Sequence, residues 1–294
     1  MRLCGAIPPM ITPFGKDGSL DEQAVASVAS FLAKYVHGLF ICGTYGGGPL
    51  MTVAERKRVC ELTIKAVEGK IPVIAHIGTM DTASALELAT HAEKAGAKAV
   101  ASIPPAYFAH NEDNVLHYFK SLVDAIDIPV YLYNNPKTVG YAISPKFLAK
   151  IAEEAHISGV KDSSFDIMVF SDYKRYCGPE FDVVLGTEAL LLPAMAVGAQ
   201  AFIPGLGNAF PKLMADFYQV CAQGNTLEAR AFQHKVNRIR DAVHLGGANL
   251  VTVQELLRLQ GVNAGWPRLP FRPLTPDKLA KVQTALEQCE IWPA

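Results

Sequence analysis

Hydrophobic residues recur along this 294-residue chain in short runs, which polar and amphipathic stretches separate. Short apolar runs bounded by turn residues are typical of strands buried on both faces. Eight such runs occur, at Ala6 to Ile11, Gly38 to Cys42, Val73 to Ile77, Ala99 to Ile103, Val130 to Tyr133, Ile157 to Lys161, Val183 to Gly186 and Ala201 to Ile203. The pattern therefore predicts eight buried strands.

The segments between these runs carry signals for helix starts. Thr52 is followed three residues later by Glu55, and the two side chains can cap each other's backbone donors. Ser144 precedes Pro145, which suits the first turn of a helix. Eight alternating strand and helix units without a second break in composition favour a closed parallel barrel over an open doubly wound sheet. We therefore expect an α/β fold of the (β/α)8 TIM barrel type.

The chain continues well beyond the last predicted strand, which ends near Ile203. These residues have a helical pattern, with a Pro-rich connection from Trp266 to Pro276. We interpret them as the closing helix of the barrel followed by a C-terminal helical appendage. The predicted domains are a barrel over residues 1–225 and a helical extension over residues 226–294.

One uncharged segment, Ala189 to Phe210, is long enough to cross a bilayer. Two prolines, Pro193 and Pro204, and several glycines interrupt it. We predict a buried helix followed by a buried strand, because a barrel core requires such runs. No membrane partner is expected.

Composition and charge favour a small-molecule partner. Half of the residues are hydrophobic, and 27 basic residues nearly balance 28 acidic ones, giving a formal net charge of −1. The chain can therefore bury a large core, and it has no run of five like charges that would indicate nucleic-acid binding.

The six cysteines are widely scattered and form no CxxC pair, which predicts neither a zinc site nor a disulfide framework. We expect reduced and mostly buried thiols. Pro8 and Pro9 precede any apolar region at the N-terminus, which argues against a secretory signal. The expected location is cytoplasmic.

Active sites of parallel barrels lie at the carboxyl ends of the strands, so polar residues that close a predicted strand are the candidates. Lys161 closes the run that begins at Ile157. Burial there would lower the pKa of the ammonium group and leave the neutral amine that attack on a carbonyl requires. The alternative is a structural ion pair between Lys161 and Asp162.

Tyr133 closes the preceding strand run and is followed by Asn134, Asn135 and Pro136. Its phenol is expected on the same rim as Lys161. A phenol can both donate and accept a proton, as imine formation and carbon–carbon cleavage require. The alternative is a tyrosine that only packs at the rim of the core.

A Gly-rich loop, Gly43 to Pro49, follows the second predicted strand. Such a loop can turn successive backbone N–H groups toward one point and bind a carboxylate, with the Thr44 hydroxyl as a further donor. It lacks the Lys-Ser/Thr ending of a P-loop and the GxGxxG spacing of a dinucleotide site. A purely structural turn is the alternative.

Together these features resemble the dihydrodipicolinate synthase/N-acetylneuraminate lyase family of Schiff-base aldolases. The resemblance rests on five segments in order along nearly the whole chain: Ile7 to Phe14, Gly43 to Pro49, Pro104 to Phe108, Tyr133 to Pro136, and Gly159 to Ser163. It implies that Lys161 forms an imine with a 2-oxo acid and that Tyr133 moves protons. It further implies that Thr44 links Tyr133 to Tyr107, which a neighbouring subunit contributes.

The resemblance also implies a pyruvate pocket that includes Tyr45 and the backbone around Ile203. Because the imine itself supplies the electrophile, no metal or organic cofactor is expected. A shared Tyr107 implies a homo-oligomer, either a dimer or a homotetramer built as a dimer of dimers.

Within the family, synthases that condense pyruvate with aspartate semialdehyde carry an arginine two residues after the proline of the YNxP segment, where this chain has Thr138. Segments Gly46 to Leu50, Gly140 to Tyr141 and Gly265 to Arg268 are instead similar to archaeal-type 2-keto-3-deoxygluconate aldolases. Val139 replaces the usual threonine of the sugar aldolases and cannot hydrogen-bond a substrate hydroxyl. Thr138 and Val139 are thus expected to line the acceptor pocket.

We therefore predict a Schiff-base carbon–carbon lyase that cleaves a 2-keto-3-deoxy sugar acid to pyruvate and an aldehyde. One alternative is another lyase of the family, either 4-hydroxy-tetrahydrodipicolinate synthase or a sugar-acid dehydratase. A different class is a barrel that binds a 2-oxo acid without turnover. The joint presence of Lys161, Tyr133, Thr44 and Tyr107 favours catalysis.

Overall fold

The computed structural model describes residues 2–292, which include one sheet of eight parallel strands. The strands are β1 (Gly5–Ala6), β2 (Leu39–Ile41), β3 (Val73–His76), β4 (Ala99–Ser102), β5 (Val130–Asn134), β6 (Gly159–Asp162), β7 (Asp182–Leu185) and β8 (Ala201–Phe202). Their order is β1, β8, β7, β6, β5, β4, β3, β2. Pro9, just after β1, bridges Phe40 on β2 and joins the two edges. The predicted (β/α)8 barrel is confirmed.

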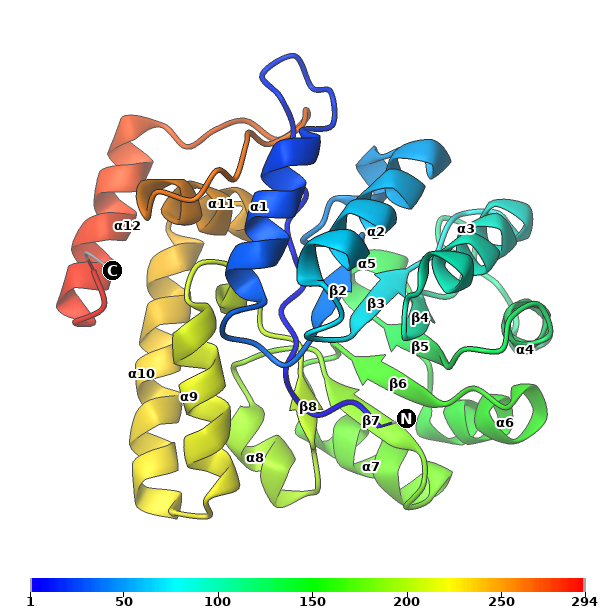
Figure 1. Ribbon diagram of the computed structural model, residues 1–294. Helices are drawn as coiled ribbons and strands as arrows, with labels where there is room; N and C mark the ends of the chain where they lie inside the picture. The colour runs from blue at the N-terminus through cyan, green and yellow to red at the C-terminus, as the bar shows by residue number, and fades with distance from the viewer. Residues whose placement is uncertain (1, 293–294) are drawn as a thin grey trace.

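Helices connect the strands and cover the outside of the barrel (Figure 1). They are α1 (Glu22–Leu32), α2 (Val53–Val67), α3 (Thr82–Ala95), α4 (Glu112–Val123), α5 (Pro136–Val139), α6 (Pro145–Ala155), α7 (Ile167–Cys177), α8 (Leu191–Ala196), α9 (Pro211–Ala222), α10 (Thr226–His244), α11 (Asn249–Leu259) and α12 (Pro276–Gln288). Both predicted helix starts are present. Thr52 and Glu55 form a capping box on α2, and Ser144 caps α6 with Pro145 in its first turn.

The first strand is shorter than the apolar run from Ala6 to Ile11 predicts. Its regular pairing with β8 covers only Gly5–Ala6. Pro8 and Pro9 have no backbone N–H and cannot continue a regular ladder. The chain nevertheless stays against β2, because the Met10 N–H donates to the Phe40 carbonyl at 2.9 Å.

Alternation along the strands divides the core into two layers. On β5, Val130 and Leu132 pack outward in the cluster shared with the helices, while Tyr131 and Tyr133 lie in a separate cluster inside the barrel. This is the period of two that a β-strand imposes on its side chains. The last inward position of β5 is therefore a tyrosine at the carboxyl end of the barrel.

The uncharged segment from Ala189 to Phe210 forms α8, then β8, then a short 3₁₀ helix over Gly205–Asn208. The predicted buried strand is confirmed, since Phe202 is fully buried. The helix is buried on one face only, because Leu191 and Ala194 are fully buried and the rest of α8 is partly buried or exposed. Within residues 2–292, no helix combines the length and the apolar character needed to cross a membrane.

The C-terminal residues form the helices that the sequence predicts. Figure 1 shows α9 and α10 side by side, with α12 beside α10, on one side of the barrel. The Pro-rich connection is tied to the start of the chain, because Phe14 and Trp266 exchange two backbone hydrogen bonds at 3.0 and 2.7 Å. We propose the domain division at residue 225, since Asn225 is the N-cap of α10.

The six cysteines are free thiols, as predicted. Cys42, Cys60, Cys221 and Cys289 are buried, whereas Cys4 is exposed. Burial raises the pKa of Cys42 and of Cys177 to about 11, so both remain protonated and unreactive near neutral pH.

Candidate active site

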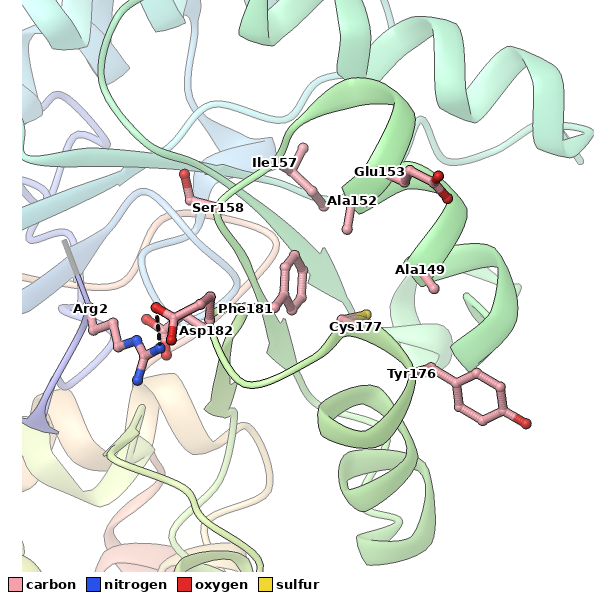
Figure 2. Close-up of a pocket in the computed structure, with 11 residues that line it drawn as sticks. Arg2, Ala149, Ala152, Glu153, Ile157, Ser158, Tyr176, Cys177, Phe181 and Asp182 are labelled. Atoms are coloured by element: carbon pink, nitrogen blue, oxygen red, sulfur yellow. Dashed lines mark ion pairs between the residues drawn. The ribbon is translucent and has the colours of Figure 1, made fainter.

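Cavities open at both ends of the barrel. The larger, about 600 Å³, lies at the amino ends of β6 and β7, where Arg2, Ser158 and Asp182 line it (Figure 2). Arg2 pairs there with Glu180 at 2.9 Å. The cavity at the carboxyl ends of the strands is smaller, about 390 Å³, but Lys161 lines it. Catalytic residues of parallel barrels come from the carboxyl ends, so the smaller cavity is the candidate active site.

Strand register brings the two predicted catalytic side chains together. Tyr133 on β5 and Lys161 on β6 are paired positions of neighbouring strands. Tyr133 lies two residues after Tyr131, and Lys161 lies two residues after Gly159, so all four positions face the inside of the barrel. Gly159 is required there, because a Cβ would lie 2.5 Å from the Tyr131 ring. The absence of a side chain at Gly159 thus lets the tyrosines of β5 fill the barrel beneath Lys161.

Lys161 is almost completely buried, at 4% exposure. Its Nζ lies 3.8 Å from the ring centroid of Tyr133 and 3.9 Å from that of Phe40. Burial lowers the pKa of Lys161 below its ordinary value of 10.5, and the neighbouring Tyr133 partly opposes this shift. Lys161 is thereby biased toward the neutral amine.

The alternative ion pair between Lys161 and Asp162 is absent from the described residues. The Asp162 carboxylate instead accepts hydrogen bonds from Asn134 Nδ2 at 2.8 Å and from Ser164 Oγ at 2.7 Å. Burial raises the pKa of Asp162, although both of these hydrogen bonds oppose the rise. Asp162 therefore stabilises the ends of β5 and β6, and Lys161 stays available to the cavity.

The Tyr133 phenol lies at the centre of a hydrogen-bonded group. Its Oη is 3.4 Å from Thr44 Oγ1 and accepts from Asn135 Nδ2 at 3.1 Å. Burial by itself raises the pKa of Tyr133, but the charge of Lys161 and the hydrogen bonds of Thr44 and Ser163 outweigh burial. The net pKa is below the ordinary value of 10.0. This arrangement suits a group that gives and takes protons.

The Gly-rich loop contributes Thr44 and Tyr45 to the cavity wall. Two glycines make this placement possible, because each lies too close to neighbouring atoms to carry a side chain. A Cβ at Gly205 would overlap the Tyr45 phenol, and a Cβ at Gly48 would overlap the Cys42 carbonyl. Burial, and next the charge of Glu188, raise the pKa of Tyr45, so its phenol stays neutral.

A buried carboxylate, which the sequence reasoning missed, lies across the cavity. Glu188 accepts the Gly205 N–H at 2.9 Å and pairs with Arg240 Nε at 3.3 Å. Burial raises the pKa of Glu188, and Arg240 opposes this shift. The Arg240 guanidinium also lies 5.3 Å from the Phe165 ring centroid. The pair joins the end of β7 to α10.

The cavity residues that the sequence reasoning missed differ in whether the sequence carried a signal for them. Glu188 follows a predicted strand by two residues, so the strand-end rule could have found it. Arg240, His244 and Asn249 come from α10 and α11 in the extension, where no strand-end signal exists. Lys137, on α5, also lines the cavity.

Other predicted site residues have different positions. Ile203 and Thr138 line the cavity. Val139 is buried on α5 but is not among the described residues that line it. Tyr107 also lies outside the cavity of its own chain: its side chain is 85% exposed and touches Phe108, with 5.1 Å between ring centroids. An exposed Tyr107 is available to a second chain.

Known proteins are similar to this chain along almost its full length. The model of the dihydrodipicolinate synthetase family matches residues 2–289. A 4-hydroxy-tetrahydrodipicolinate synthase of Archaeoglobus fulgidus is 31% identical over 287 residues, which are 98% of each chain.

Solved structures show the same fold with different family activities. YagE, a prophage protein of the dihydrodipicolinic acid synthase family from E. coli K12 in complex with pyruvate, has a TM-score of 0.93 at 27% identity and covers 98% of this chain and 99% of its own. KD(P)GA from T. tenax has a TM-score of 0.88 at 32% identity, with the same coverage. The chain therefore belongs to the dihydrodipicolinate synthetase family and is a Schiff-base-forming carbon–carbon lyase.

Proposed function

We propose that this chain is a pyruvate-dependent aldolase that cleaves a 2-keto-3-deoxy sugar acid to pyruvate and an aldehyde, with Lys161 as the imine-forming amine. The observation that carries the proposal is a buried lysine with a lowered pKa, held 3.8 Å from the Tyr133 ring at the carboxyl end of the barrel. A neutral amine beside a proton-transfer group is what attack on a ketone requires.

The reaction begins when the Lys161 amine attacks the 2-oxo carbon of the substrate. The carbinolamine loses its hydroxyl as water, with Tyr133 supplying the proton, and an iminium forms. Tyr133, now a phenolate, takes the proton of the C4 hydroxyl, and the electrons of the C3–C4 bond move into the iminium. The aldehyde leaves, and Tyr133 returns its proton to C3 of the enamine. Water then adds to the resulting iminium, Tyr133 takes back a proton, and pyruvate and the free Lys161 amine are released. The lowered pKa of Tyr133 favours the phenolate step.

The substrate carboxylate is assigned to the Gly-rich loop. Thr44 and Tyr45 line the cavity, while the N–H groups of Gly47 and Gly48 bond within the loop, to Thr44 and Gly43. The donors proposed for the carboxylate are therefore the backbone N–H groups of Thr44 and Tyr45 and the Thr44 hydroxyl. Successive backbone N–H groups in a turn provide such an anion site.

The acceptor side of the cavity supports a neutral aldehyde. A second carboxylate, as in aspartate semialdehyde, is bound best by a guanidinium that has no other partner. The synthases carry an arginine two residues after the proline of the YNxP segment, whereas this chain has Thr138 there. Arg240 also lines the cavity, but the buried Glu188 carboxylate pairs with it at 3.3 Å and neutralises its charge. One solved neighbour supports this choice, since it is named KD(P)GA.

The second candidate is 4-hydroxy-tetrahydrodipicolinate synthase, because curated relatives at 31% and 33% identity carry that name. A sugar-acid dehydratase shares the same imine step. All of these use Lys161 and differ in the acceptor pocket.

Matched assays distinguish the candidates. We expect kcat/KM for condensing pyruvate with glyceraldehyde to exceed that with aspartate semialdehyde, at equal pyruvate saturation. Loss of one charge-assisted contact corresponds to roughly tenfold to several hundredfold. A clear preference for aspartate semialdehyde would establish the synthase instead.

We further propose that the active enzyme is a cytoplasmic homo-oligomer. Tyr107 supports this, since its ring projects from the chain at 85% exposure, with a backbone φ of 75° that a tyrosine rarely adopts. A strained and exposed aromatic residue is explained if its side chain packs against a second chain.

A further inference from the structure

The amine of Lys161 is flanked by two aromatic faces, and one of them has no role in the proposed proton transfers. The Phe40 ring lies with its centroid 3.9 Å from Lys161 Nζ, as close as the 3.8 Å of Tyr133. The two rings are nearly perpendicular, at 81°, with centroids 5.9 Å apart. The nitrogen therefore sits in the corner between two ring faces.

Several features of the chain fix the Phe40 ring in this position. On β2, Leu39 and Ile41 pack outward in the helix layer, and Phe40 between them faces the barrel interior at 1% exposure. A Cβ at Gly43 would lie 2.5 Å from the Phe40 ring, so Gly43 leaves the space that the ring occupies. The ring of His76 is 6.1 Å from that of Phe40. Phe40 is thus held rigidly beside the amine.

The ring face carries a negative partial charge that attracts cations within about 6 Å, most strongly where water is excluded. Among the described residues Lys161 forms no ion pair, and its nitrogen faces the rings of Phe40 and Tyr133. During turnover this nitrogen is cationic as the iminium, both before the carbon–carbon bond breaks and after the enamine is protonated. We propose that Phe40 is a further catalytic residue, whose ring face stabilises the positive charge of the Lys161 iminium.

This proposal rests on Lys161 as the imine-forming residue and adds a specific energetic role for an apolar neighbour. Above the pKa of Lys161, the amine is neutral and only the iminium gains from the ring, so Phe40 raises the yield of iminium. Below that pKa, ammonium and iminium gain alike, and the effect cancels. A side chain that merely fills space would show no such dependence on pH.

The experiment replaces Phe40 by 4-fluoro-, 3,5-difluoro- and 3,4,5-trifluorophenylalanine, which reduce the negative charge of the ring face stepwise at nearly constant size. The equilibrium constant for iminium formation with pyruvate is measured by native intact mass of the unreduced adduct over a range of pyruvate concentrations, at pH values on both sides of the Lys161 midpoint. We expect a graded loss above the midpoint, roughly threefold to thirtyfold across the series, and convergence below it.

The matched control is the same series at Phe202, a fully buried phenylalanine whose ring packs on Phe217 and Tyr218 in the outer layer. That series should leave the iminium yield unchanged. A flat response at Phe40, or an equal loss at Phe202, would overturn the role of Phe40. If the unsubstituted enzyme forms no pyruvate adduct on Lys161, the proposed function itself fails, which is a distinguishable result.

Discussion

Tyr133 and Lys161 are register partners on neighbouring strands, and the Lys161 nitrogen lies 3.8 Å from the Tyr133 ring centroid. Each group changes the ionisation of the other: Tyr133 opposes the loss of the Lys161 proton, and Lys161 helps to lower the pKa of Tyr133. A proton shared between the two can therefore move at low cost. This coupling explains how one small site can both form an imine and break a carbon–carbon bond.

Borohydride added with pyruvate should inactivate the enzyme irreversibly, because reduction of the iminium fixes the substrate carbon on the lysine. Peptide mass mapping should locate the adduct on Lys161. The variant Lys161→Met keeps an unbranched apolar stem and should give neither adduct nor turnover. An adduct on another lysine during normal turnover would contradict the assignment.

The pH dependence of adduct formation follows from the lowered pKa of Lys161. The neutral amine is the reactive form, so the rate should rise with pH through the pKa of Lys161, with a midpoint below the ordinary 10.5. Phe40→Leu removes an aromatic face that favours the ammonium and should move the midpoint further down. Cyanoborohydride trapping over a pH series measures both midpoints, and a midpoint at or above 10.5 in the wild type would refute the effect of burial.

Replacing Tyr133 by phenylalanine removes the phenol and keeps the ring beside Lys161. Turnover should fall by roughly a hundredfold or more, the usual scale for a positioned acid–base group, while the fold is retained. Thr44→Val is a milder companion change, because Thr44 contacts the phenol at 3.4 Å but does not itself exchange the proton. If Tyr133→Phe stays within a few-fold of wild type in steady-state assays, Tyr133 only packs at the rim.

Acid should weaken the fold through His76, which is 5% exposed. Burial, and next the charges of Arg56 and Lys161, hold the pKa of His76 well below the ordinary 6.5. The unfolded chain therefore takes up a proton at a pH where the folded chain does not, and stability falls as pH drops below 6.5. From about pH 7.5 to about 5.5, this group should lower the free energy of unfolding by about 1.4 kcal/mol.

Urea unfolding of wild type and His76→Gln at both pH values isolates this contribution. Glutamine can accept the Ile103 N–H that now faces His76 Nε2 at 3.3 Å, and it does not titrate. The acid-induced loss of stability should be smaller in the variant by about the same 1.4 kcal/mol. Equal losses in both proteins would show that His76 is not the responsible group.

The barrel and the rim positions of Lys161 and Tyr133 were predictable because both depend on local sequence, whereas the catalytic roles of this pair were predicted from the family resemblance. Each strand is a short apolar run, and a polar residue that ends such a run lies at the carboxyl rim wherever the barrel closes. Glu188 and Arg240 form their ion pair only after β7 and α10 meet, so no local pattern indicates it. Phe40 likewise cannot be distinguished from other apolar residues in the sequence, because its ring lies beside Lys161 only when the barrel closes.

Tyr107 should matter only in an assembled enzyme, because its exposed side chain lies outside the cavity of its own chain. Inactive Lys161→Ala and Tyr107→Phe chains, mixed under conditions that exchange subunits, should regain some activity, since a mixed oligomer contains one intact site. Phe108→Leu, at the neighbouring exposed ring, serves as a control for general surface effects. A fully active monomer by light scattering would exclude the shared site.

Thr138→Arg should move substrate choice toward aspartate semialdehyde. Thr138 lines the cavity, and the Glu188 carboxylate in the same cavity is already paired with Arg240. A bidentate contact with a second carboxylate should raise kcat/KM for aspartate semialdehyde relative to glyceraldehyde by roughly tenfold or more. Thr138→Gln, similar in reach but uncharged, should give much less, and Thr138→Lys an intermediate gain because its charge is not bidentate. The ratio of the two kcat/KM values in coupled assays measures the effect; an unchanged ratio in Thr138→Arg would mean that the aldehyde binds elsewhere in the cavity.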